Sequence, residues 1–326
     1  MNLKTITALA VVALLAGAAV FVMMPDDEIS IAYSEKVNYE TIIVANEKGW
    51  LSEEGISGKV VVGGIEAAEA LLTGSVQFAA MGDGPAVTLA AKNSHVKILA
   101  RFIDGENAHR FIANRSLIPN IESIAGEGLG QGDNPLKVGV QGSSSTHAAL
   151  LNWMSKNGIT PGVDLQIVTM KPTELPLAVK AGELAMMAGS EPWAVNTENE
   201  CGDDVYEIGT SAGLESTYPI LLLTTDRVIE RHPDAVRGVL RAMDRANQFI
   251  NDDWGEAMEI CSSRTGLSME DQIRCSDPQR YELGFEDSDI LSFNIAAKAM
   301  LLFGSIEALP VVDDHVELSF LREILA

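Results

Sequence analysis

The sequence is poor in positive charge. It has 23 lysines and arginines against 46 aspartates and glutamates, a formal net charge of -23. Nucleic acids and anionic membrane surfaces are bound through clusters of basic side chains, so this composition argues against both as partners. The acidic excess does not indicate a cationic ligand, because most surface carboxylates only solvate the protein.

Cysteine is also scarce: the chain has only Cys201, Cys261 and Cys275. Their spacing does not match the Cys-x2-Cys pairs of metal sites, and we expect neither a metal nor a cofactor. Outside the cytoplasm, Cys261 and Cys275 can close a short loop as a disulfide, which would leave Cys201 unpaired. Three free or buried thiols are an equally acceptable alternative.

Motifs for nucleophilic or phosphate chemistry are missing from the most polar turn, GVQGSSSTHAALLNW at residues 139–153. A phosphate-binding Walker loop requires a lysine here, and a nucleophile elbow requires a second glycine. We therefore expect no catalytic residues and no enzyme activity. Two interpretations of Ser143–Thr146 stay open. The hydroxyls either only cap the helix that follows, or they bind a polar ligand at its positive N-terminus.

The N-terminus carries about 19 apolar or small residues without charge at positions 6–24. A membrane-spanning helix needs ~20 such residues, whereas Ala16-Gly17-Ala18 also resembles a signal-peptidase site. Residues 1–24 are therefore predicted to be a signal peptide or, by preference, a membrane anchor. With Lys4 on the inner side, the rest of the chain lies outside the cytoplasm. No cysteine lies near this segment for lipid attachment.

From residue 29 onward, short apolar runs alternate with helical patterns, which predicts an α/β protein with mostly parallel sheets. The predicted strands are residues 31–34, 59–62, 76–81, 96–102, 111–114, 136–140, 165–170, 184–188, 205–208 and 219–224. The predicted helices are residues 39–48, 65–72, 85–92, 175–181, 233–251, 290–302 and one that begins at Ala148. A glycine-rich segment at residues 126–135 interrupts the series, and the two α/β blocks on either side of it predict two lobes.

Ligands of such folds bind beyond the carboxyl ends of the strands. The turns after the predicted strands carry glycines, hydroxyls or acids, for example Gly82-Asp83-Gly84-Pro85 and Gly189-Ser190-Glu191-Pro192-Trp193. From these turns and a neighbouring aromatic side chain we predict the following ligand-binding residues: Ser34, Glu35, Tyr39, Gly64, Asp83, Gly84, Ser144, Ser145, Thr146, Glu191 and Trp193.

The order of these pieces resembles the substrate-binding proteins of ABC importers for nitrate, sulfonates and taurine, and for the pyrimidine precursor of thiamine. The resemblance covers residues 29–250 and rests on five segments: IIVANEKGWLSEEGI, EAAEALLTGSVQFAAMGDGPAVTLAA, KVGVQGSSSTHAALLNWMSKNGI, ELPLAVKAGELAMMAGSEPWAV and YPILLLTTDRVIERHPDAVRGVLRAM. Three features depart from the family: the segment 126–134 is long, the lipid-anchoring cysteine is absent, and so is the cysteine run of the pyrimidine-synthesising enzymes.

The resemblance implies a type II periplasmic-binding-protein fold with the ligand cleft between its lobes. Lobe 1 would hold residues 29–115 and 219–326, lobe 2 would hold residues 116–218, and hinges would lie near 111–116 and Tyr218. A monomer would capture a small polar ligand of sulfonate, nitrate, taurine or aminopyrimidine type and deliver it to an ABC permease. An anchored extracellular sensor domain of the same fold is the alternative.

The expected ligand has an acceptor end and a donor end. The hydroxyls of residues 144–146 suit the acceptor end, whereas Asp83 and Glu191 suit the donor end. Flat apolar surface or cation–π contact is offered by Trp193, Tyr33 and Tyr39. Arg101 and Arg110 are further candidates if the ligand is a simple anion.

Overall fold

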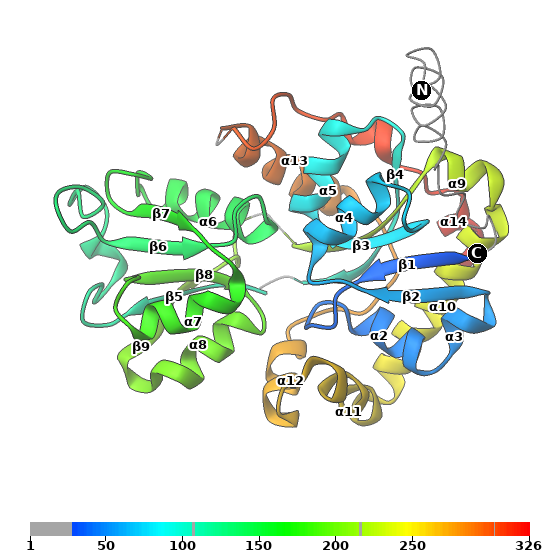
Figure 1. Ribbon diagram of the computed structural model, residues 1–326, viewed down its shortest axis with the longest axis horizontal. Coiled ribbons are helices and arrows are strands. Elements are labelled where there is room, and N and C mark those ends of the chain that lie inside the picture. The colour runs from blue at the N-terminus through cyan, green and yellow to red at the C-terminus, as the bar shows by residue number, and fades with distance from the viewer. Residues whose placement is uncertain (1–27, 106–107, 215–216, 303) are drawn as a thin grey trace, which may run out of the picture.

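A computed structural model describes residues 28–105, 108–214, 217–302 and 304–326. Two five-stranded sheets, each with helices on both faces, form two lobes that lie side by side (Figure 1). In both sheets one inner strand runs against the direction of the other four. The predicted two-lobed α/β organisation, with sheets that are mostly parallel, is confirmed.

The first sheet has the strand order β2-β1-β3-β10-β4. Its strands are β1 (Ile29–Tyr33), β2 (Ile56–Val60), β3 (Phe78–Gly82), β4 (Val96–Asp104) and β10 (Pro219–Thr225). The central strands β3 and β10 are almost wholly apolar, because helices cover both faces of the sheet and leave neither in water.

The helices of the first lobe form two layers around this sheet. They are α2 (Glu40–Glu47), α3 (Trp50–Glu53), α4 (Gly64–Leu72), α5 (Asp83–Lys92), α9 (Asp226–Arg231), α10 (Pro233–Asp252), α11 (Trp254–Thr265), α12 (Met269–Ser276), α13 (Asp287–Leu302) and α14 (Ser319–Leu325). Helices α2, α10 and α11 pack on one face of the sheet, and α4, α5 and α13 pack on the other. The C-terminal third is thus the helical wrap that the sequence predicts.

The second sheet has the order β7-β6-β8-β5-β9. Its strands are β5 (His109–Asn114), β6 (Lys137–Val140), β7 (Gln166–Thr169), β8 (Met186–Ser190) and β9 (Val205–Thr210), and its helices are α6 (Ser145–Lys156), α7 (Leu175–Lys180) and α8 (Trp193–Cys201). Short 3-10 turns complete the chain: η1 (Ile121–Ser123), η2 (Pro172–Glu174), η3 (Gly202–Asp204) and η4 (Val312–His315).

Strand β5 corrects the predicted lobe boundary at residue 115. It pairs antiparallel with β8 and with β9, so it belongs to the second sheet. The chain therefore crosses between the lobes from Asp104 to His109, and returns between Thr210 and Pro219. An apolar strand carries no local mark of the sheet that it joins, because its pairing depends on residues far away in the sequence.

The cysteines are thiols in the structure, so the Cys261–Cys275 disulfide that the sequence allows is not formed. Cys261 lies in the apolar core of the first lobe and Cys275 is buried beside the second lobe, whereas Cys201 is partly exposed. The residues that the structure describes include no helix long and apolar enough to cross a membrane. The predicted signal peptide or anchor at residues 1–24 lies outside the described residues.

Candidate functional site

Two strand-end turns, one from each lobe, touch directly. Strand β3 runs into α5 through Gly82-Asp83-Gly84, and this turn packs against the first residues of α6. The Gly84 N–H donates a hydrogen bond of 2.9 Å to Ser145 Oγ. A Cβ atom added at Gly84 would lie 2.4 Å from the Ser145 backbone nitrogen, so only glycine permits this approach. The lobes are therefore closed on one another at this point.

The predicted hydroxyl run lies at this junction, and each of its members has a protein partner. Ser144 Oγ accepts a hydrogen bond of 3.1 Å from the His147 N–H and donates one of 2.7 Å to the Gln141 carbonyl, which makes Ser144 the N-cap of α6. Thr146 Oγ1 lies 3.0 Å from His109 Nδ1. Helix α6 begins at Ser145, three residues before the predicted start at Ala148, because the cap lies inside the hydroxyl run.

The capping role leads to a prediction for Ser144. Its replacement by alanine should lower the free energy of unfolding by about 1 kcal/mol, because one N–H at the start of α6 loses its acceptor. Chemical denaturation measures the loss, and Ser143→Ala is the neighbouring control, because Ser143 does not cap the helix. Equal stability of the two variants would contradict the assignment of the cap.

Asp83 is buried and braced within its own lobe. Its carboxylate accepts hydrogen bonds from the Gly84 N–H at 2.8 Å and from Ser292 Oγ, in α13, at 2.9 Å. Burial raises the pKa of Asp83, and hydrogen bonds from Ser145 and Ser292 oppose that rise. The carboxylate thus ties the start of α5 to α13 beside the contact between the lobes.

A partly buried cation that the sequence analysis missed lies near this junction. Lys36, in the turn after β1, places its ammonium 5.7 Å from the centre of the Tyr39 ring. Burial lowers the pKa of Lys36, and the charge of Glu66 only partly opposes this. In the described part of the chain, no residue makes a hydrogen bond or ion pair of 4 Å or less with this ammonium. A lysine in a polar turn is ordinary in sequence, so no local signal singles it out.

His109 and Tyr218 bring the two chain crossings together near Lys36. Their rings are 3.8 Å apart, and Tyr218 has a positive φ of 48°. Burial and the nearby charge of Lys36 lower the pKa of His109 to about 3, so its imidazole is neutral at ordinary pH. A neutral imidazole, a phenol and an ammonium are groups that can donate hydrogen bonds to an anionic ligand.

Beside the crossings, an interlobe cavity of about 230 Å³ opens. It is lined by Gly105, Ala108, Arg110, Glu191, Glu207, Thr210, Arg274, Cys275, Pro278 and Gln279. The lining combines both crossings, the second lobe and the end of α12 from the first lobe, so it exists only where the lobes meet. Of the predicted ligand-binding residues, it contains Glu191.

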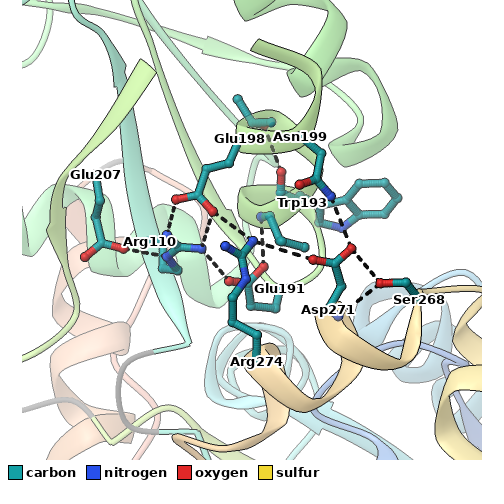
Figure 2. Close-up of polar contacts among 11 residues, drawn as sticks. Arg110, Glu191, Trp193, Glu198, Asn199, Glu207, Ser268, Asp271 and Arg274 are labelled. Carbon is teal, nitrogen blue, oxygen red and sulfur yellow. Dashed lines mark hydrogen bonds and ion pairs between the residues drawn. The ribbon is translucent and has the colours of Figure 1, made fainter. Parts of the chain in front are cut away.

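Arg110 organises the charges of this cavity (Figure 2). Its guanidinium donates to Glu191 at 2.8 Å and to Glu198 at 3.2 Å, and it also contacts Glu207. Burial by itself would lower the pKa of Arg110, but the hydrogen bonds of Glu198 and the charge of Glu191 raise it above its ordinary value. Arg274, which also lines the cavity, contacts Glu198 as well, so three carboxylates surround two guanidiniums. Glu191 also braces α8, because its second oxygen accepts the Val195 N–H at 3.1 Å.

The other predicted ligand-binding residues lie around the Gly84–Ser145 contact and the interlobe cavity, and they do not form one cluster. Ser34 donates to the Val62 carbonyl at 3.0 Å, and Glu35 accepts a hydrogen bond of 2.8 Å from Arg264. Tyr39 is buried, and its hydroxyl lies 3.4 Å from the position of a Cβ on Gly64. Trp193 is partly buried and lines a small pocket of the second lobe together with Thr146.

Arg101 is not a ligand residue in this arrangement. It is buried in the first lobe, where it pairs with the buried Asp289 at 3.1 Å and with the exposed Glu282 at 3.1 Å. Within the described ranges, no group of three His, Cys, Asp or Glu side chains is placed to hold a metal ion.

Residues 23–263 match the model of the NMT1-like family. The chain belongs to this family. Among solved structures, this NMT1-like chain is similar to the periplasmic aliphatic sulphonate-binding protein SsuA of Escherichia coli, with a TM-score of 0.76, 17% identity and coverage of 89% of this chain and 92% of that one. It is also similar to the periplasmic nitrate-binding protein NrtA of Synechocystis PCC 6803, with a TM-score of 0.72, 16% identity and coverage of 91% and 88%.

A curated relative of the NMT1-like chain is the bicarbonate transport ATP-binding protein CmpC of Synechococcus elongatus, 27% identical over 136 residues. The match covers 40% of this chain and spans only 20% of the length of that relative. Together with the two lobes and the strand-end junction, these findings confirm the periplasmic-binding-protein fold and the resemblance to importer substrate-binding proteins.

Proposed function

We propose that this protein is an extracytoplasmic solute-binding protein. It captures a small polar ligand between its lobes and delivers it to an ABC permease, without chemical change to the ligand. The observation that carries this proposal is the cavity of about 230 Å³ between the lobes, which both lobes line. A ligand held there contacts both lobes at once, so its binding energy favours the closed form, which a permease can recognise.

Charged groups of both signs lie near the chain crossings and limit the class of ligand. Lys36 offers an ammonium that no carboxylate among the described residues contacts directly, and this group suits a sulfonate, a nitrate or a carboxylate. Glu191 and Glu207 in the cavity wall can accept hydrogen bonds from an amine, and Arg110 and Arg274 in the same wall balance their charge. A compact aminosulfonate such as taurine has both features, whereas nitrate has only the first. We infer that a zwitterionic sulfonate is preferred over nitrate.

A thermal-shift screen followed by calorimetry tests the proposal. The probes are taurine, ethanesulfonate, nitrate, bicarbonate and an aminopyrimidine, applied to the chain without residues 1–27. Taurine should raise the melting temperature most, and mass spectrometry should recover it unchanged. A modified product would contradict a transport role, and stabilisation by none of the probes would contradict the ligand class.

Replacing Lys36 by methionine should weaken taurine binding by about 10- to 150-fold. A hydrogen bond to a charged group is worth about 1.5–3 kcal/mol, and the loss converts directly to affinity. Lys92→Met is the matched control, since Lys92 is exposed at the end of α5. Calorimetry should give unchanged binding for the control. Equal affinity of the Lys36 variant and the wild type would remove Lys36 from the site.

A further inference from the structure

Helix α12 is anchored in the first lobe but reaches the second. Ser276 Oγ donates to Glu40 Oε1 at 2.8 Å, and Gln272 Nε2 lies 3.3 Å from the same oxygen. Glu40 is fully buried at the start of α2, which packs on the first sheet. These bonds fix one side of α12 to the first lobe, while its opposite side faces α8 of the second lobe (Figure 2).

Polar and apolar contacts cross from α12 to α8. Arg274 Nη2 donates to Glu198 Oε2 at 3.0 Å, and Asn199 Nδ2 donates to Asp271 Oδ2 at 3.2 Å. Beneath them, Cys275 packs with Val195 of α8 and Val37 of the first lobe in one small apolar cluster. We call Val195, Glu198, Asn199, Asp271, Arg274 and Cys275 the α8–α12 latch.

Glu198 links the latch to the interlobe cavity. One carboxylate accepts hydrogen bonds from Arg274 in the first lobe and from Arg110 in the second. Arg110 also holds Glu191 and Glu207, which line the cavity. A ligand amine that binds Glu191 or Glu207 competes with Arg110 for that carboxylate. Arg110 can then bind Glu198 more strongly, which changes the strength of the ion pair between Glu198 and Arg274.

We propose that the α8–α12 latch holds the two lobes closed, and that Glu198 couples the strength of the latch to the charges in the cavity. The inference rests on the lobe closure that the proposed function requires. The latch should be sensitive to salt because its charges are partly exposed: the side chain of Arg274 is 50% exposed and that of Glu198 is 24% exposed. The contact at Gly84 and Ser145 lies elsewhere on the junction and contains no charged pair.

Cys275 supplies a built-in reporter of opening. It is 4% exposed between the lobes, whereas Cys261 is fully buried in the core of the first lobe and Cys201 is partly exposed. In a Cys201→Ser background, reaction with a thiol reagent such as DTNB therefore measures how often the lobes separate at Cys275. This readout requires no ligand, so failure of the ligand screen and failure of the latch are distinguishable.

The test compares Arg274→Gln with the matched control Arg245→Gln. Arg245 makes an exposed ion pair with Glu53 inside the first lobe, at 2.8 Å, and does not approach the second lobe. An exposed pair contributes up to about a fivefold change in an equilibrium. We expect Arg274→Gln to accelerate labelling of Cys275 about two- to fivefold and Arg245→Gln to leave the rate unchanged. Burial raises the pKa of Cys275 and the charge of Arg274 opposes this rise, so loss of that charge alone would slow the labelling of Cys275.

Salt and a second variant complete the experiment. Raising sodium chloride from 0.05 to about 1 M, where the screening length falls to ~3 Å, should accelerate labelling of the wild type more than that of Arg274→Gln. Asn199→Ala should add to the effect of Arg274→Gln. A wild-type labelling rate in Arg274→Gln, or equal acceleration in Arg245→Gln, would overturn the latch.

Discussion

Replacing Arg101 by methionine is expected to lower the free energy of unfolding by about 3–5 kcal/mol, the usual cost of leaving one member of a buried ion pair alone. Arg101 and Asp289 are both almost fully buried, with side chains 3% and 1% exposed. Burial raises the pKa of Asp289, and the charge of Arg101 opposes this rise. Without Arg101 the carboxylate would stay in the core with no cation beside it. Urea denaturation of the wild type and the variant measures the loss.

The pH dependence and a double variant separate this cause from simple loss of packing. The deficit of Arg101→Met should shrink as the pH falls through the raised pKa of Asp289. A carboxyl whose pKa is raised in the folded state destabilises the fold above that pKa and ceases to do so once it is protonated. Adding Asp289→Leu should recover most of the stability, because neither charge is then buried. A deficit that stays constant as the pH is lowered, or that persists in the double variant, would contradict the ion-pair explanation.

Replacing Gly84 by alanine is expected to shift the lobes from closed to open by about 100-fold or more. The new Cβ would lie 2.4 Å from the Ser145 nitrogen and 2.7 Å from the Ser144 carbonyl carbon, and both are backbone atoms that cannot rotate away. Overpacking of a core that can adjust costs about 1–3 kcal/mol, and 3 kcal/mol corresponds to roughly 100-fold. The nearest atoms all belong to the second lobe, so each lobe should keep its own stability.

Labelling of Cys275 and taurine affinity both report this shift. In Gly84→Ala the thiol should react much faster and taurine should bind about 100-fold more weakly, with little change in the denaturation of the individual lobes. Gly255→Ala is the matched control, because a Cβ at Gly255, in α11, meets no atom within 4 Å. Unchanged labelling in Gly84→Ala would show that the lobes meet differently in solution.

The secondary structure was predictable because its signals are local. Apolar runs of strand length and helical spacing lie within a few residues of one another, and the turns between them carry glycine and hydroxyl residues. The predicted start of α6 was three residues late. The sequence predicted a hydroxyl cap before Ala148, and the structure shows that Ser144 is that cap and that the helix begins at Ser145. The strand-end rule placed Gly84, Ser145 and Thr146 among the ligand-binding residues. The structure shows a hydrogen bond between Gly84 and Ser145, and the role of the three residues in ligand binding stays a prediction.

Partnerships between distant residues were not predictable in the same way. Arg101 and Arg110 look alike in sequence, but one is buried against Asp289 inside the first lobe and the other lines the interlobe cavity. In the sequence, Lys36 is one more charge in a polar turn. In the structure, burial lowers its pKa, and no carboxylate in the described part of the chain contacts its ammonium. These differences depend on which elements pack around each side chain, and no spacing in the sequence records that.

By itself, the sequence determined the alternation of strands and helices, the two-lobed fold, the polar turns at the strand ends and the resemblance to importer binding proteins. Each of these depends on short-range patterns or on segments that keep their order along the chain. Only the tertiary structure decided that β5 joins the second sheet, that the three cysteines stay thiols, and that α12 crosses to α8. The reason is physical: strand pairing, burial and lobe contact are set by residues as much as 241 positions apart, whose mutual distances the sequence does not contain.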